Sequence, residues 1–217
     1  MNATRLREIQ IYAPHLGRDL NNRLSVLSEV AYHLLRRARP AARILKLVVR
    51  IAPDAPSIPG DQLIHWPGKI SEFRVVDGLI HDGVDDQILR GRVSVHVAQA
   101  VDAVRDTFSS GPPASLIGQF EAELSRAAPY EFELVDLAIR DPVTGQQFRV
   151  FHRFGPDFSE VVWRADGLQP IESNLAAIDS FLDLGALFTA TQARIVNGAV
   201  VYYRGREQIA TVPVPGV

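Results

Sequence analysis

The chain has 217 residues, a formal net charge of −2, 47% hydrophobic and 22% charged residues, and no cysteine. These values are typical of a globular protein with a full hydrophobic core, and they exclude a disulfide scaffold, a cysteine nucleophile and thiolate metal sites. The small net charge also argues against a nucleic-acid partner, because no general positive field recruits phosphates.

The N-terminal segment carries several charges and no long apolar stretch, so no secretion signal is predicted. The most apolar segment, 44–51, is interrupted by Lys46 and Arg50 and is too short to cross a bilayer. We therefore expect a cytoplasmic protein without a membrane partner. Arginine outnumbers lysine by 21 to 2, which we interpret as the codon bias of a GC-rich bacterial genome.

The clearest element of the N-terminal part is a helix over 20–38, where apolar residues recur at three- and four-residue steps. Asp19 is the predicted N-cap, and Pro40 is expected to end the helix. Residues 1–17 are compatible with either a short strand or a helical turn. A strand is predicted over 43–51.

The middle of the chain predicts further short elements. Asp77-Gly78 lies between two apolar runs, a pattern that predicts a tight hairpin. Residues 92–97 alternate like a strand, and the spacing then changes to that of a helix over 97–108. A second helix is predicted around 116–124, after the break at 111–113.

The C-terminal part predicts mainly strands. Three follow one another at 131–140, 147–154 and 158–164, a helix is predicted at 171–184, and a second meander at 192–212. Helices and antiparallel hairpins interleave without regular strand–helix alternation. The predicted fold is therefore α+β, with antiparallel sheet meanders packed with several helices. It is a single domain over 1–217, with possible lobes at 1–128 and 129–217.

A candidate catalytic group depends on the register of the strands after residue 131. If Phe154 pairs with Phe158, His152 faces Glu160, and Asp136 lies diagonal to them on the same sheet face. Two carboxylates beside an imidazole can support proton transfer or bind a divalent metal. Cross-strand charge pairs on a solvated face are the alternative explanation. No motif indicates a resident metal or cofactor, so none is predicted.

Candidate binding residues come from two charged segments and one tryptophan. The acidic loop over 77–86 includes Asp82, Asp85 and Asp86, and can engage a basic partner or simply be solvated. The basic tract begins with Arg36 and Arg37, where helix-end electrostatics is an alternative explanation. Trp66 is either an interface anchor or a cover for the core.

These patterns leave two hypotheses. The first is a protein-binding module of the bacterial cytoplasm, such as an inhibitor or immunity-type partner of a toxin or effector. It follows from the missing catalytic motifs together with the segregated charge. The second is an enzyme, a hydrolase or acid–base catalyst, that uses His152, Glu160 and Asp136. Whether the chain is an enzyme is left open by its sequence.

Overall fold

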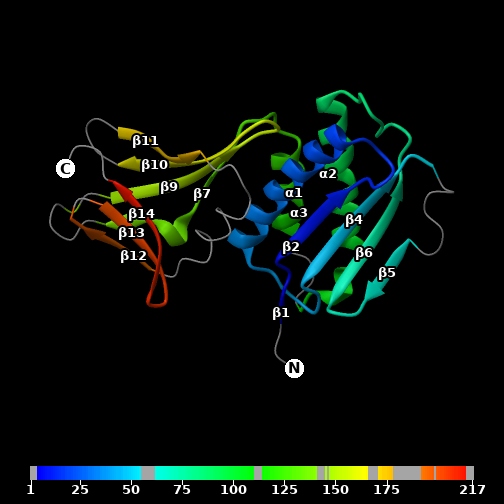
Figure 1. Cartoon of the computed structure of the whole chain (residues 1–217). Coiled ribbons are helices and arrows are strands. Elements are labelled where there is room, and N and C mark those ends of the chain that lie inside the picture. The colour runs from blue at the N-terminus through cyan, green and yellow to red at the C-terminus, as the bar shows by residue number, and fades with distance from the viewer. Residues whose placement is uncertain are drawn as a thin grey trace. The chain divides into compact units, whose positions relative to one another are not determined.

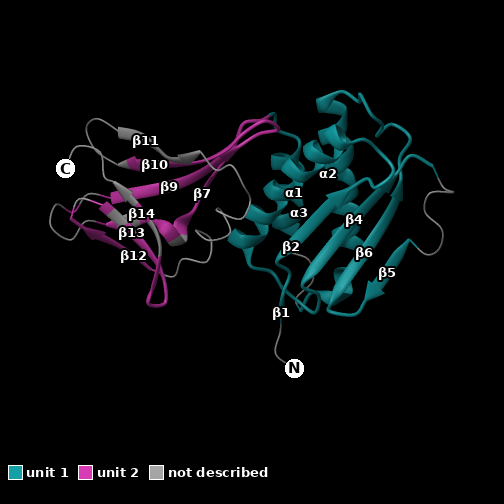
Figure 2. Cartoon of the chain, viewed as in Figure 1, with its two compact units in different colours: residues 1–127 teal, residues 128–217 magenta. Residues whose placement is uncertain are grey.

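A computed structural model gives the fold of this protein and describes residues 4–54, 62–109, 114–140, 145, 147–165, 171–177, 192–197 and 199–213. The fold is α+β, as the sequence predicts. The chain divides into two compact units, unit 1 over residues 1–127 and unit 2 over residues 128–217 (Figure 2). No helix within the described ranges is long and apolar enough to cross a membrane.

Unit 1 is built on a mixed four-stranded sheet with the strand order β2-β4-β6-β5 (Figure 1). Strands β2, β4 and β6 are parallel, and β5 is antiparallel to β6. The elements of unit 1 are β1 (Thr4–Arg5), β2 (Glu8–Tyr12), α1 (Arg18–Ala38), β3 (Ala41–Ala42), β4 (Lys46–Ala52), β5 (Leu63–Trp66), β6 (Ile70–Val76), α2 (Asp86–Ala103), the 3₁₀ turn η2 (Arg105–Thr107) and α3 (Ala114–Leu124).

The long helix α1 confirms the prediction from its apolar stripe. Leu24, Leu27 and Leu34 are all buried, because residues at this spacing lie on one face of a helix. The predicted N-cap is wrong, since Gly17 occupies that position and Asp19 lies in the first turn. There its carboxylate still favours the positive end of the helix dipole.

The helices of unit 1 lie on one face of its sheet. Helix α1 packs on β2, α2 packs on β4 and β6, and α3 contacts both helices. The side chains that point to this face are buried. Ile11 on β2, Val49 on β4 and Phe73 on β6, which lie in register, are examples. Residues one position along each strand point to the other face, which no described helix of unit 1 covers.

Two further predictions in unit 1 are wrong. The predicted strand at 92–97 lies inside α2, which contacts the sheet on one side and α3 on another. The strand-like alternation arises because the exposed Val95 lies between Val93 and Val97, which are both buried, so apolar residues occur on both sides of this helix. Asp77-Gly78 does not close a hairpin but leads from β6 into the loop before α2. The hairpin at this sheet joins β5 to β6 and turns at Gly68, where φ is +84°.

Unit 2 contains two antiparallel sheets, which confirms the two predicted meanders. The first sheet has the order β11-β10-β9-β7, with β8 also pairing with β9, and the second has the order β12-β13-β14. The elements are β7 (Tyr130–Glu133), the 3₁₀ turn η3 (Val135–Leu137), β8 (Ile139–Arg140), β9 (Gln147–Phe154), β10 (Ser159–Ala165), β11 (Ile171–Ala177), β12 (Gln192–Val196), β13 (Ala199–Arg204) and β14 (Glu207–Pro213).

The predicted helix over 171–184 is wrong in its first half, because residues 171–177 form β11, which pairs with β10. The second half of that prediction lies outside the described residues. The predicted strand over 131–140 is interrupted by η3, so only its two ends pair with β9. Apolar residues at helical spacing in a short segment do not distinguish a helix from a buried strand.

The register of the first sheet differs by one residue from the predicted register. Phe154 pairs with Ser159 and not with Phe158, and His152 pairs with Val161 and not with Glu160. Since neighbouring residues of a strand point to opposite faces, this slip exchanges the two faces of the sheet. The buried face of β9 therefore carries Phe148, Val150, His152 and Phe154, whereas the prediction placed His152 on the solvated face.

Candidate functional site

The structure does not bring the three predicted catalytic residues together on one face. His152 is buried, and its Nε2 lies 2.9 Å from the hydroxyl of Ser159. Glu160, on the opposite face of β10, accepts a hydrogen bond of 3.2 Å from Arg153. Asp136 belongs to the turn η3, and its side chain lies outside the described part of the chain. The sheet geometry thus separates His152 from Glu160, because a one-residue shift reverses the direction of the side chain.

Glu160 belongs instead to a ladder of ion pairs on the other face of this sheet. The carboxylate of Glu131 accepts two hydrogen bonds of 2.7 Å from Arg164 and one of 3.2 Å from Arg153. The hydrogen bonds from Arg164 lower the pKa of Glu131 below its usual value, although partial burial opposes this change. The guanidinium of Arg164 also lies over the ring of Phe151, 4.4 Å from its centroid. These charges satisfy one another, which is typical of a stabilising cross-strand network.

The aspartates of the acidic loop have structural roles in unit 1. Asp85 is the N-cap of α2, and its carboxylate accepts hydrogen bonds from the amides of Gln87 and Ile88 at 2.8 and 3.3 Å. Asp82 accepts a hydrogen bond of 2.8 Å from the amide of Gly17, and Asp86 forms an ion pair with Arg23. The loop is therefore tied to the start of both α1 and α2. These contacts within unit 1 explain the acidic residues of the loop, so no partner protein is needed to account for them.

The predicted basic residues lie far from this loop. Arg36 and Arg37 belong to the last turn of α1, a helix of 21 residues, whereas Asp82 is bonded at its first turn. At 1.5 Å per residue the helix is about 30 Å long. Arg37 is exposed and Arg36 is half-buried. Their position at the C-terminal end favours the helix dipole, in line with the alternative explanation for this tract.

A buried ionic cluster that the sequence did not reveal joins β6 to α2. Asp77, only 3% exposed, lies directly after β6 and accepts hydrogen bonds from His96 Nε2 at 2.6 Å and Arg92 Nε at 2.7 Å. Burial alone would raise the pKa of Asp77, but these hydrogen bonds outweigh it and the pKa is lowered. The amide of Leu79 donates a further bond of 3.0 Å to the same carboxylate. The cluster fixes α2 against β6. It was not predicted because the Asp77-Gly78 pair was interpreted as a hairpin turn.

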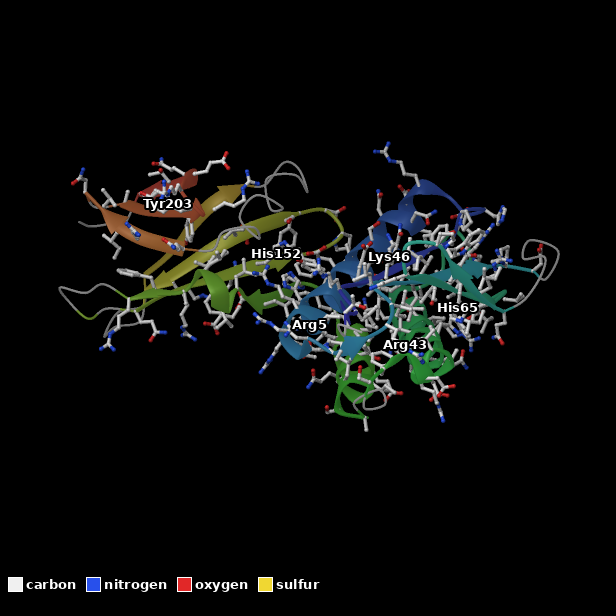
Figure 3. The ribbon with its side chains drawn as sticks, turned by 90° about the horizontal axis from the view of Figure 1, so that it is seen from below. Arg5, Arg43, Lys46, His65, His152 and Tyr203 are labelled. Carbon is white, nitrogen blue, oxygen red and sulfur yellow. The ribbon has the colours of Figure 1, made fainter. Side chains whose placement is uncertain are left out.

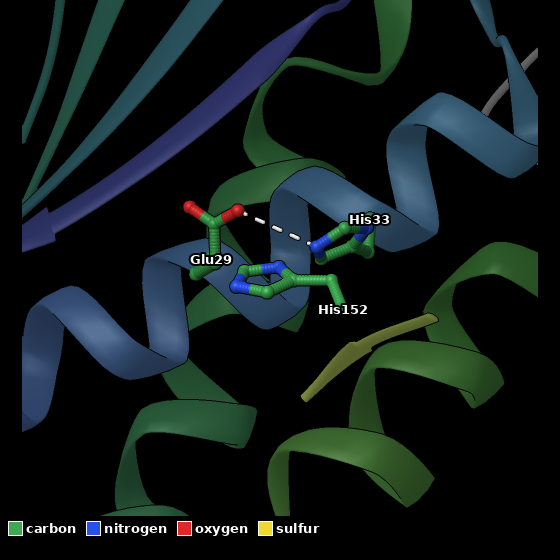
Figure 4. A group of neighbouring side chains, drawn as sticks. All are labelled: Glu29, His33 and His152. Carbon is green, nitrogen blue, oxygen red and sulfur yellow. Dashed lines mark ion pairs between the residues drawn. The ribbon is translucent and has the colours of Figure 1, made fainter. Parts of the chain in front are cut away.

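A second polar pair lies on α1. Glu29 and His33 are one helical turn apart, and both are buried. Figure 4 shows the ion pair between the Glu29 carboxylate and His33 Nε2, which are 3.4 Å apart. No sequence motif predicted this glutamate–histidine pair. Polar residues on an otherwise apolar helix stripe are the signal that could have found it.

The remaining candidate is the sheet face of unit 1 that the described helices leave uncovered, here called the helix-free face. It is defined by six side chains from four strands: Tyr12, Val48, Arg50, Glu72, Arg74 and Trp66. Trp66 is 47% exposed at the end of the edge strand β5. Figure 3 labels Lys46 on β4 and His65 on β5, two strands that β6 separates; Lys46 forms an ion pair of 2.7 Å with Glu8.

A row of three side chains crosses the helix-free face near the carboxyl ends of its parallel strands. Tyr12 pairs in register with Arg50, and Arg50 pairs with Arg74. Glu72, which is buried, lies 2.7 Å from Arg74 Nε and 3.8 Å from the nearest Arg50 nitrogen. Burial, and then the negative charge of Glu72, raise the pKa of Tyr12, so its hydroxyl stays protonated and can donate. The row therefore places two cationic side chains, Arg50 at 24% and Arg74 at 11% exposure, beside a neutral hydroxyl donor.

Comparison of the chain with protein-family models, with curated proteins and with solved structures finds no match.

Proposed function

We propose that this chain is a protein-binding module that engages its partner through the helix-free face of unit 1. The observation that carries the proposal is the half-exposed Trp66 on the same uncovered face as Tyr12, Arg50 and Arg74. Tryptophan, tyrosine and arginine are the residues that most often dominate the binding energy of protein interfaces. Because Trp66 is 47% exposed, a partner can cover about 70–120 Å² more of it, which is worth about 2–3 kcal/mol at about 25 cal/mol per Å².

The edge of the sheet adds a second means of recognition. Strand β5 is four residues long and pairs only with β6 among the described strands, so its outer backbone groups are available to another chain. A partner strand can add to such an edge while side chains on the sheet face provide specificity. Trp66 lies on β5 itself, so both kinds of contact are available at the same place.

The proposal extends to the type of partner. We infer that the chain serves in the bacterial cytoplasm as an inhibitor or immunity-type partner of a toxin or effector. The absence of a catalytic motif in the sequence supports a binding role. The separation of His152 from Glu160 removes the only acid–base group that the sequence suggested.

Site-specific photocrosslinking in the native host tests this proposal. A benzophenone amino acid replaces Trp66 in one variant and Val95 in a control; Val95 is 49% exposed but lies on α2. The proposal predicts one dominant protein adduct from position 66 and none of the same mass from position 95. Equal adducts from both positions, or no adduct together with turnover of a small molecule by the purified chain, would contradict it.

A further inference from the structure

Arg50 occupies the centre of the row on the helix-free face. It lies on β4, the middle of the three parallel strands, between Tyr12 on β2 and Arg74 on β6. Residues at the same level of neighbouring strands are about 5 Å apart, so their side chains can contact one ligand. In open sheets with parallel strands, ligands bind at the carboxyl ends of the strands. Arg50 is the third residue from the end of β4 and is close to that edge.

The guanidinium of Arg50 is poorly satisfied by the described residues. Its nearest carboxylate oxygen, on Glu72, is 3.8 Å away, and the same oxygen is held more closely by Arg74. One terminal nitrogen lies 3.4 Å from His15 Nε2, a long contact, and the buried Nε group has no hydrogen-bond partner among the described residues. A guanidinium carries five N–H donors in a planar fork that fits a carboxylate with two parallel bonds.

We propose that Arg50, assisted by Tyr12, binds a carboxylate of an acidic segment of the partner protein. This inference rests on the proposed function, because it names the chemistry by which the helix-free face recognises its partner. The partner carboxylate accepts hydrogen bonds from the guanidinium of Arg50, and the Tyr12 hydroxyl donates from the neighbouring strand. Apolar residues next to the acidic residue of the partner can pack on Val76, which is 51% exposed on the same face of β6.

The surroundings of Arg50 suit an acidic peptide segment. Glu72 contributes a negative charge within 4 Å of Arg50. The same Glu72 oxygen is held more closely by Arg74, so the donors of Arg50 remain for a partner carboxylate. A flat sheet face flanked by exposed apolar side chains also suits an extended peptide better than a small ion.

The test uses the full chain and two short synthetic peptides. One peptide alternates glutamate with valine, and its matched control replaces each glutamate by glutamine. Both are titrated into ¹⁵N-labelled protein while the Nε–H signal of Arg50, assigned by its loss in Arg50→Gln, is followed by NMR. We expect the glutamate peptide, but not the glutamine control, to shift this signal until the shift reaches a plateau. Arg50→Gln should weaken binding about tenfold or more, since a hydrogen bond to a charged group contributes about 1.5–3 kcal/mol.

Two variants check the geometry of the site. Arg50→Lys keeps the charge but loses the planar fork, so it should also weaken binding. Arg206→Gln removes an exposed arginine from unit 2 and should leave the affinity unchanged. Equal binding of both peptides, an equal loss in Arg206→Gln, or no saturable shift would overturn the inference. A shift of the same signal by inorganic phosphate but not by the acidic peptide would overturn it as well.

The outcome also separates this inference from the proposed function. If Trp66 crosslinks a partner but Arg50→Gln leaves the affinity for that partner unchanged, the docking face stands and carboxylate recognition by Arg50 is wrong. If position 66 gives no adduct and the acidic peptide does not bind, both proposals are wrong.

Discussion

Removal of the Asp77 charge should destabilise unit 1 by about 2–3 kcal/mol at neutral pH. Asp77→Asn keeps an oxygen for the amide of Leu79 but cannot accept the bonds from both His96 and Arg92. Hydrogen bonds to a charged group contribute about 1.5–3 kcal/mol each. The Arg92 side chain is 43% exposed, so water can replace its hydrogen bond to Asp77 at little cost. The buried hydrogen bond from His96 therefore accounts for most of the lost stability.

Urea unfolding followed by tryptophan fluorescence measures this effect. The chain has two tryptophans, Trp66 in unit 1 and Trp163 in unit 2, so a Trp163→Phe background reports on unit 1 alone. Asp102→Asn is the matched control, because Asp102 pairs with Arg105 on the exposed surface of α2 and its loss should change the midpoint far less. A smaller effect of Asp77→Asn than of the control would refute the reasoning.

The stability difference between wild type and Asp77→Asn should also depend on pH. The pKa of Asp77 is lower in the folded chain than in the unfolded chain, because its hydrogen bonds outweigh the effect of burial. Its contribution to the free energy of unfolding is therefore complete above the unfolded pKa and is lost as the pH falls through the folded pKa. The stability difference between wild type and Asp77→Asn should shrink in acid, and a difference that grows in acid would contradict this explanation.

Three further substitutions test the packing of the fold by urea unfolding. Leu24→Ala removes a fully buried side chain of α1 and should cost about 2–5 kcal/mol, whereas a cost typical of a surface site would show that the α1 stripe is not the core. Asp85→Ala removes the N-cap of α2 and should cost about 1 kcal/mol, with Asp85→Asn as the control that retains the cap. Tyr202→Phe should leave stability unchanged or raise it, because the buried hydroxyl has no hydrogen-bond partner among the described residues; a loss above about 1 kcal/mol would reveal a missed bond.

The parts of the fold that depend on local patterns could be predicted from the sequence. The α1 stripe, the Pro40 stop and the antiparallel meanders of unit 2 are all local signals, and the structure confirms them. The parallel pairing of β2, β4 and β6 was not predicted, because these strands lie far apart in the chain and no turn joins them directly. Helix α2 was only partly predicted because the exposed Ile88 and Val95 place apolar residues on the side away from its buried stripe.

The candidate site was harder to predict than the fold. A one-residue error in the β9–β10 register moved His152 from the core to the solvated face, which created a catalytic group that the chain does not assemble. Conversely, Arg50 was noted in the sequence only as a charge that interrupts the apolar segment 44–51. Its neighbours Tyr12 and Arg74 come from other strands, so the row appears only when the sheet is built. Of the predicted binding residues, Trp66 alone belongs to the helix-free face.

The affinity of the crosslinked partner for three purified variants tests the central claim most directly. Trp66→Ala should weaken binding by at least about tenfold, with an unchanged melting temperature, because a central interface tryptophan contributes about 2 kcal/mol or more. Arg50→Gln should weaken binding by a similar factor, and Val95→Ala, on the helix side, should leave it unchanged. Equal affinities for Trp66→Ala, Arg50→Gln and the wild type would show that the partner does not bind the helix-free face.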